Sequence, residues 1–492
     1  MLVEPLAPPR SASPAPPPAY WTRLLPGLAL LACATRLPSF ARPLWNPDEG
    51  YLAVQARLLA NGGALYETVV DRKPPLVPWL YQGAFAVFGD ASLLPLKLLA
   101  VGAHVATAAL LASFARRRWG DGAGRTAGVL YLLISVGLNP EDAQAATFEV
   151  FMLPCTAAAM WCADRRRPGL AGAAVACAFL AKQTGGAVLL PVALLLWRRA
   201  LPGTRRRDVL LLGAGLLAPV VAVALATTPG GFVFWTVTGS GAYASFTGSE
   251  LHVLFRGVAN TAILGAACAG LVPPVVRVLR VARTGAAELW LWLVASAAAV
   301  LLGFHFFGHY FLQLTPPLAL LATAALQILP GERTPRAVVA SACACALFVT
   351  WGLLAPRPDL AHAERLAQAV RARTAPDDRV LVWGIHPETY WLADRTPASR
   401  YLTAGLLTNY SGGRDGPRVG ERYAMAGAWD TFRTELASRP PALIVDDSRG
   451  KPYGPDRVPG LRRVLRAGYE PVESVGGAVV YVREGRFSPS GV

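Results

Sequence analysis

The chain has 492 residues, of which 53% are hydrophobic and 16% are charged, and its formal net charge is +16. Soluble proteins carry about 25% charged residues, so the composition excludes a disordered chain and argues against an ordinary soluble enzyme. The basic residues form short clusters between long apolar runs, which is typical of the cytoplasmic loops of a membrane protein and not of a nucleic-acid-binding surface. We therefore predict a polytopic α-helical membrane protein that does not bind nucleic acid.

Apolar runs along the chain predict about eleven transmembrane helices. A helix needs about 20 residues to cross roughly 30 Å of hydrocarbon at 1.5 Å per residue. The proline-rich residues 1–19 precede the first run and are predicted to form a disordered cytoplasmic tail. The expected spans are residues 22–40, 92–115, 124–139, 146–163, 168–183, 186–200, 208–228, 253–275, 286–304, 309–329 and 337–356.

The arginine clusters predict the sidedness of these spans. The run at 74–89 is short and is interrupted by Pro78 and Gly83. Counting it as a span would move the cluster at 116–118 outside, so we predict that it is a helix at the membrane interface, within a first outer loop at 41–91. With the N-terminus inside, the clusters then all face the cytoplasm, at 116–118, 165–167, 198–207, 277–283 and 333–336.

Residues 357–492 differ from the rest, because they mix acidic and basic residues and contain no run long enough to span a membrane. The predicted topology places them outside. Residues 20–356 are thus expected to form the transmembrane domain of a protein in the cytoplasmic membrane, and 357–492 a small extracytoplasmic α/β domain. Its expected elements are a helix at 360–373 and strands at 379–384, 442–445 and 477–482.

Polar residues outside the arginine clusters converge on the outer face in this topology. Ionisable groups at membrane depth are costly and commonly functional, so the convergence predicts one site at the outer interface. A carboxylate there could act as a general base, and basic groups could neutralise a phosphate leaving group. The converging residues are Asp48, Glu49, Asp71, Arg72, Lys73, Glu141, Asp142, Glu149, Lys182, His305 and His309, together with the aromatic loop at 229–252.

The same segments resemble the GT-C superfamily of membrane glycosyltransferases. The closest resemblance is to the branch with protein O-mannosyltransferases and the lipid A aminoarabinose transferase. It covers about residues 20–410. The matching pieces are Asn46-Pro-Asp-Glu-Gly-Tyr51, Lys73-Pro-Pro-Leu76, Ala181-Lys-Gln183, Gly308-His-Tyr-Phe-Leu-Gln-Leu-Thr-Pro-Pro317, Val382-Trp-Gly384 with Pro387-Glu388, and Pro397-Ala-Ser-Arg-Tyr401.

The resemblance implies an inverting transferase, hexosyl or pentosyl, with a polyprenyl-phosphate sugar as donor. It implies that Asp48 is the catalytic base, that Glu49 helps to hold the acceptor or its partner groups, and that Lys73 contacts the lipid phosphate. Further phosphate candidates are Arg72, Lys182 and His309. Glu141 and Asp142 match a second acidic position and are, with Tyr51, candidates for binding the acceptor or sugar. No DxD motif is present, so no metal is assigned, and a divalent cation stays open.

Other interpretations of these residues stay open. Asp48 and Glu49 could cap a helix, since acids favour helix N-termini, and Lys73 could snorkel to the interface. His305 and His309 have the i,i+4 spacing of paired metal ligands on a helix. The alternative function is a transporter or lipid flippase, which would require broken helices near the membrane midplane. The outer domain does not resemble the repeat domain of eukaryotic O-mannosyltransferases, so the acceptor (a glycan, a lipid or a protein) is open.

Overall fold

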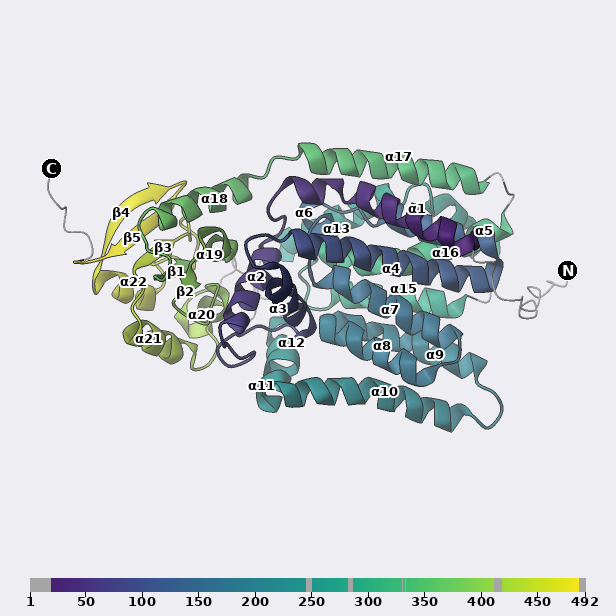
Figure 1. Cartoon of the computed structure of the whole chain (residues 1–492), viewed down its shortest axis with the longest axis horizontal. Coiled ribbons are helices and arrows are strands. Elements are labelled where there is room, and N and C mark those ends of the chain that lie inside the picture. Colours follow the sequence, from purple (N-terminus) through teal and green to yellow (C-terminus); the bar gives the residue numbers. More distant parts are fainter. Residues whose placement is uncertain are drawn as a thin grey trace.

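The computed structural model describes residues 19–244, 250–281, 286–329, 331, 333–410 and 418–485. It has two parts, a bundle of apolar helices and a smaller α/β part at its C-terminal end (Figure 1). Residues 1–18 of the expected tail lie outside the described residues. So do residues 245–249 of the aromatic loop and 282–285 of a basic cluster.

The helices of the bundle run roughly along one common direction (Figure 1). Among the described residues, the stretches 94–119, 205–226, 308–328 and 333–371 are each long and apolar enough to include a membrane span. The chain is thus a helical membrane protein, as its composition predicted. The bundle helices are α1 (Ala19–Thr35), α4 (Leu94–Trp119), α5 (Asp121–Ile134), α7 (Phe148–Asp164), α8 (Pro168–Ala181), α9 (Leu189–Arg199), α10 (Arg205–Ala226), α13 (Glu250–Ala267), α14 (Val272–Val281), α15 (Ala287–Leu301), α16 (Thr315–Ile328) and α17 (Arg333–Leu354).

One predicted span is divided in the structure. The run at 253–275 was expected to be a single helix, but α13 ends at Ala267 and α14 begins at Val272. Pro273 and Pro274 follow at once, and proline has no backbone N–H to continue a helix from the preceding turn. The hydrophobic run is therefore real, but the two prolines break it.

Short elements gather at the end of the bundle that faces the C-terminal part (Figure 1). The apolar run at 74–89 forms one of them, α3, which packs against α2. The described elements at this end are η1 (Leu37–Ala41), α2 (Pro47–Ala60), α3 (Leu76–Phe88), α6 (Pro140–Ala143), η2 (Gln183–Val188), α11 (Pro229–Val233), η3 (Phe234–Thr238), α12 (Gly239–Ala244) and η4 (Gly308–Leu314).

The C-terminal part contains a five-stranded sheet with the order β2-β1-β3-β5-β4. Strand β1 is parallel to β2 and β3, and β5 is antiparallel to β3 and β4. The three expected strands are present as β1 (Arg379–Trp383), β3 (Leu443–Asp446) and β5 (Ala478–Arg483). The sequence did not predict β2 (Thr396–Pro397) and β4 (Tyr469–Val475). The remaining elements are α18 (Pro358–Arg371), α19 (Glu388–Ala393), α20 (Gly405–Thr408), η5 (Glu421–Tyr423), α21 (Ala428–Ser438) and α22 (Pro459–Arg466).

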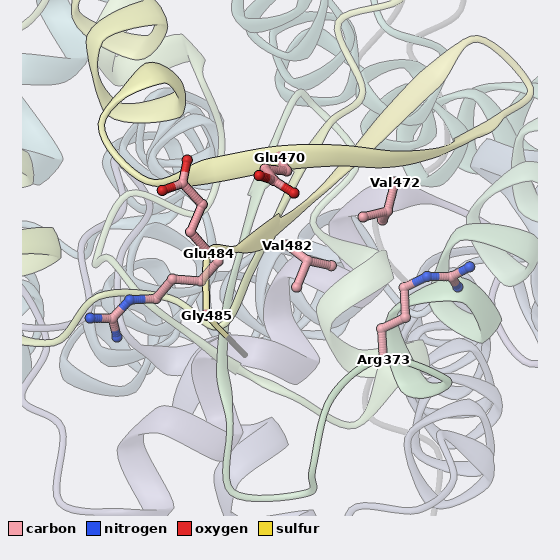
Figure 2. Close-up of a pocket in the computed structure, with 7 residues that line it drawn as sticks. Arg373, Glu470, Val472, Val482, Glu484 and Gly485 are labelled. Carbon is pink, nitrogen blue, oxygen red and sulfur yellow. The ribbon is translucent and has the colours of Figure 1, made fainter. Parts of the chain in front are cut away.

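The two unexpected strands lack the usual sequence pattern. Strand β2 has two residues, and β4 is an edge strand that contains Glu470, Pro471 and Glu473. Charges and proline are common on edge strands, because they discourage pairing with other chains. A hollow of about 160 Å³ lies beside the β4–β5 hairpin, and Figure 2 shows the side chains that line it. Its lining residues are Arg373, Glu470, Val472, Val482, Arg483, Glu484 and Gly485.

Candidate active site

The first turn of α2 presents Asp48 at the end of the bundle. The side chain of Asn46 caps the helix by accepting a hydrogen bond from the Asp48 N–H at 2.9 Å, and Pro47 occupies the first turn. Asn46 therefore carries the capping role that Asp48 could have had. The Asp48 carboxylate keeps 36% of its side-chain surface exposed, and one of its oxygens lies 3.9 Å from the Lys73 ammonium.

Glu49 points the other way, into the protein. Its side chain is fully buried, and it accepts hydrogen bonds from the backbone N–H groups of Trp45 at 2.5 Å, Asn46 at 3.3 Å and Ala146 at 2.8 Å. Burial raises the pKa of Glu49, although the charge of Lys97 and these N–H groups oppose the shift. Glu49 thus completes a capping box with Asn46 and joins the first outer loop to the segment before α7, while its contact with the acceptor or its partner groups stays a prediction.

Lys73 lies where the first outer loop meets the start of α7. Its ammonium lies between the Asp48 carboxylate and the ring of Phe148, 4.0 Å from the ring centroid. The loop is held by Asp71, whose carboxylate accepts from the Gln55 amide at 3.1 Å and from the Lys73 N–H at 3.2 Å. Lys73 is thus a cation whose backbone is fixed by a hydrogen bond to Asp71, and it lies beside the Asp48 carboxylate.

A second, buried charge cluster lies behind this pair. Lys182, which follows α8, forms an ion pair with Glu149 in the first turn of α7, and its ammonium lies 3.8 Å from the centroid of the Tyr310 ring. His309 on η4 bonds to Asp142 on α6 through Nδ1 at 2.6 Å, and its Nε2 lies 3.9 Å from Glu149. Asp142 and Glu149, from the consecutive elements α6 and α7, therefore share one group of charges with Lys182 and His309, which are distant from them in sequence.

Glu141 and Asp142 are adjacent in sequence but face different surroundings. Asp142 is buried against His309, whereas Glu141 keeps 47% of its side chain exposed and lies 3.8 Å from Arg357. Arg357 donates to the Trp45 carbonyl, and its guanidinium lies 4.9 Å from the centre of the Trp45 ring. Burial and the charge of Asp142 raise the pKa of Glu141, and Arg357 opposes them. The acidic pair thus connects the buried charge cluster, through Asp142, to the solvent-exposed surface, through Glu141.

Tyr51 and Arg72 are engaged in holding the loop. The Tyr51 hydroxyl donates to the Val70 carbonyl at 2.9 Å, and burial raises its pKa well above the ordinary value. Arg72 donates to the Tyr410 carbonyl and lies 4.5 Å from the centre of the Tyr410 ring. The structure therefore turns Arg72, a phosphate-binding candidate from the sequence, toward Tyr410 of the C-terminal part.

The two histidines do not share a helical face. Residues 302–307 are not helical, and Phe304 and Phe306 have φ angles of 54° and 50°. The i,i+4 helical spacing that left a metal pair open as an interpretation is thus not formed. Instead, the rings of His305, Phe307 and His309 stack in a row at 5.8 and 5.7 Å. Within the described ranges, no group of three or more histidine, cysteine and acidic side chains is arranged to hold a metal.

The C-terminal part sits directly on α2 (Figure 1). A Cβ atom at Gly50 would lie 2.3 Å from the Cβ of Glu388, the first residue of α19. Arg57 forms ion pairs with Asp90 at 2.6 Å and with Asp394 at 2.9 Å. The helix that carries Asp48 is therefore positioned from both sides, by the bundle and by the C-terminal part.

Sequence reasoning missed Arg357 as part of this region. It stands between two prolines in the short link from α17 to α18, where nothing local distinguishes it from a solvated arginine. One of its partners is Trp45, which is 312 residues away along the chain. The other is Glu141. Only a prediction of long-range contacts could have identified it.

Comparison with known proteins identifies the fold that carries these residues. Residues 72–227 match the family of dolichyl-phosphate-mannose-protein mannosyltransferases, whereas no curated protein matches. ArnT from Cupriavidus metallidurans, bound to undecaprenyl phosphate, is 16% identical with a TM-score of 0.61 over 96% of this chain and 100% of ArnT. Its apo form is 17% identical with a TM-score of 0.62, over 94% and 98%.

A third similar structure belongs to a longer protein. The Archaeoglobus fulgidus oligosaccharyltransferase, tethered to an acceptor peptide with the NVT sequon, is 14% identical with a TM-score of 0.52. The match covers 95% of this chain and 74% of that enzyme. At such identities the likeness shows the fold. The chain therefore has the GT-C fold of membrane glycosyltransferases, as its sequence resemblance implied.

Proposed function

We propose that the chain is an inverting glycosyltransferase. It moves a sugar from a polyprenyl-phosphate donor to an acceptor hydroxyl at the outer face of the cytoplasmic membrane, with the N-terminus inside and the C-terminal part outside. One observation carries the proposal. The half-exposed carboxylate of Asp48 stands beside Lys73, and a buried group of further cations, Lys182 and His309, lies behind them. This arrangement combines a base for a hydroxyl with cations for a phosphate.

The reaction is a single displacement at the anomeric carbon of the donor sugar. The acceptor oxygen forms the new bond while the bond from that carbon to the phosphate oxygen breaks, so the configuration inverts. Asp48 takes the proton of the acceptor hydroxyl. The oxygen–carbon bonding electrons leave with the polyprenyl phosphate, whose growing negative charge is stabilised by Lys73 and, behind it, Lys182 and His309. Glu49, Tyr51 and Asp71 hold the backbone that presents Asp48 and Lys73.

The related proteins support the class of donor. The ArnT structure holds undecaprenyl phosphate, and the matching family is named for the use of dolichyl phosphate mannose. The first is a free polyprenyl phosphate and the second is a sugar ester of one. The C-terminal part borders α2 on the side away from the bundle (Figure 1), so we propose that it shapes the acceptor side, next to the partly exposed carboxylates of Glu141 and Asp48. The acceptor class stays a glycan, a lipid or a protein.

A donor-consumption assay tests the proposal. Wild type, Asp48→Asn and Asp208→Asn are reconstituted with a panel of polyprenyl-phosphate sugars and an envelope extract, and free polyprenyl phosphate is followed by mass spectrometry. Asp208 lies in the first turn of α10, where it accepts from Thr204 at 3.1 Å, and serves as the matched carboxylate control. We expect release by wild type and by Asp208→Asn, and a loss of at least about 100-fold in Asp48→Asn, because general-base catalysis contributes typically 10²–10⁴-fold.

Two results would count against the proposal. Equal release by all three proteins would remove Asp48 from the mechanism. No release with any donor, from protein that is folded and inserted, would favour the transporter or flippase alternative, in which the polar groups guide a lipid without breaking a bond.

A further inference from the structure

A groove lies between α1 and α5 at the end of the bundle that is remote from the candidate active site (Figure 1). It is open and has a volume of about 420 Å³. On α1 its lining residues are spaced by three and four, from Tyr20 through Arg23 to Gly27 and Leu28, so they form one stripe of the helix. None of these residues takes part in the proposed reaction.

The groove changes from polar to apolar along its length. Arg23 on α1 and Arg125 on α5 line its outer end, near the start of both helices. Gly27, Leu28 and Val129 line the part that is deeper in the bundle by about one to two turns, or roughly 5–8 Å at 1.5 Å per residue. A charged end at the membrane surface and an apolar end toward the hydrocarbon match the two parts of a phospholipid.

The charge at the polar end is not balanced within the protein. Asp121 is the acid that lines the groove, and it is already paired with Arg116 at 2.6 Å. The Arg116 guanidinium also lies 4.1 Å from the centre of the Tyr20 ring. Arg23 and Arg125 are exposed and form no ion pair within the part of the chain that the structure describes. The polar end therefore presents two guanidinium groups to the membrane surface.

The apolar end has room for a chain. A Cβ atom at Gly27 would meet nothing within 4 Å, whereas Leu28 is buried and closes the space behind it. Gly27 thus keeps the floor of the groove open, although glycine is costly in a helix interior compared with alanine. A larger side chain at this position would fill the groove without a clash inside the protein.

We propose that this groove binds an anionic glycerophospholipid of the leaflet at this end of the bundle. The phosphate is recognised by Arg23 and Arg125, since guanidinium groups form charge-assisted hydrogen bonds with phosphate oxygens. One acyl chain follows the apolar floor past Gly27 and Val129. The site is separate from the donor site at the opposite end, so it stands or falls independently of the proposed transferase activity.

Native mass spectrometry of the full-length protein tests the site. The protein is titrated with phosphatidylglycerol and, separately, with phosphatidylcholine of the same chains. We expect one tightly held phosphatidylglycerol on wild type and on the control Arg206→Gln/Arg207→Gln, which removes two exposed arginines from the start of α10. Each of Arg23→Gln and Arg125→Gln should weaken binding about fivefold, and the double variant roughly 30-fold, from the usual contribution of an arginine near an anionic surface.

Gly27→Leu separates a shaped site from general surface charge, because it fills the groove and leaves both arginines in place. We expect it to weaken phosphatidylglycerol binding at unchanged net charge, with thermal unfolding like that of wild type. Equal binding by Gly27→Leu and wild type, equal binding by the two double variants, or equal affinity for phosphatidylcholine would each overturn the proposal. Loss of binding on removal of residues 1–18 alone would place the lipid on that segment and would also overturn it.

Discussion

Gly50 is predicted to be essential for the position of Asp48, and Gly50→Ala tests this directly. A Cβ atom at residue 50 would lie 2.3 Å from the Cβ and 2.5 Å from the Cα of Glu388. Neither atom can move by rotating a side chain, so α19 or α2 must shift by about 1 Å to restore an ordinary contact of 3.4 Å. Overpacking of this kind costs about 1–3 kcal/mol, partly offset by the better helix propensity of alanine, about 1 kcal/mol. We expect a net loss of up to about 2 kcal/mol.

The same shift reaches the chemistry, because Asp48 lies two residues before Gly50 on the same helix. A misplacement of 1 Å can cost about 100-fold in rate, so we expect kcat of Gly50→Ala to fall by up to that factor. The measurements are the thermal unfolding midpoint and polyprenyl-phosphate release. Gly83→Ala in the neighbouring helix α3 is the matched control, since a Cβ atom there meets nothing within 4 Å. If the two variants had equal midpoints and equal rates, the close packing of α19 on α2 would be refuted.

Three further predictions concern buried charges. Glu49→Gln should lower stability by about 1–3 kcal/mol, because three backbone N–H groups lose a charged acceptor; an unchanged unfolding midpoint would contradict this. Lys182→Met should destabilise by about 3–5 kcal/mol, because the buried Glu149 carboxylate loses its nearest cation and keeps only the Nε2 of His309, at 3.9 Å. The double variant with Glu149→Leu should then recover stability but not donor turnover; recovery of both would remove the pair from the reaction. Burial lowers the pKa of His386, but its bond to Glu388 at 2.9 Å more than offsets this and raises the pKa above the ordinary 6.5. That stabilisation is complete below about pH 6.5 and is lost as the pH rises through the raised pKa, so the midpoint of wild type should fall there more than that of His386→Asn; parallel curves would disprove the link.

The sequence predicted the membrane-spanning class well, because the relevant signal is local. Apolar runs and arginine clusters reflect the solvent around each segment, and tertiary packing does not change that solvent. The same signal does not predict breaks within an apolar run. Between α13 and α14, two prolines divide the run into two helices. The signal was also weak for β4, which is exposed at an edge and therefore lacks the alternating pattern of a half-buried strand.

The site was predictable only in part, for a related reason. Asp48 and Lys73 lie in one loop, so their proximity follows from a short stretch of sequence. The difference between Asp48 and Glu49 follows only in part, because Glu49 forms a local capping box with Asn46 but also accepts from the N–H of Ala146, which is 97 residues away. Arg72 and Lys73 are likewise adjacent, yet Arg72 turns to Tyr410. Neighbouring residues of the same charge, such as Arg72 and Lys73, thus differ in role because the fold gives them different long-range contacts.

The cations of the proposed site are already matched with carboxylates, Lys73 with Asp48, Lys182 with Glu149 and His309 with Asp142. Each basic group therefore has a carboxylate partner before the donor reacts.

The charges of the donor and of the base change together during the reaction. The donor phosphodiester carries one negative charge, and the phosphate monoester that leaves carries up to two. When Asp48 takes the proton of the acceptor it becomes neutral and no longer attracts Lys73, whose ammonium can then pair with the phosphate at the moment its charge increases. Loss of charge at the base and gain of charge at the leaving group are therefore coupled through one lysine, and the site needs no further cation to keep its net charge constant. On this account Asp48→Asn should bind the donor at least as tightly as wild type while failing to turn it over, because Lys73 is released in advance and the base is gone.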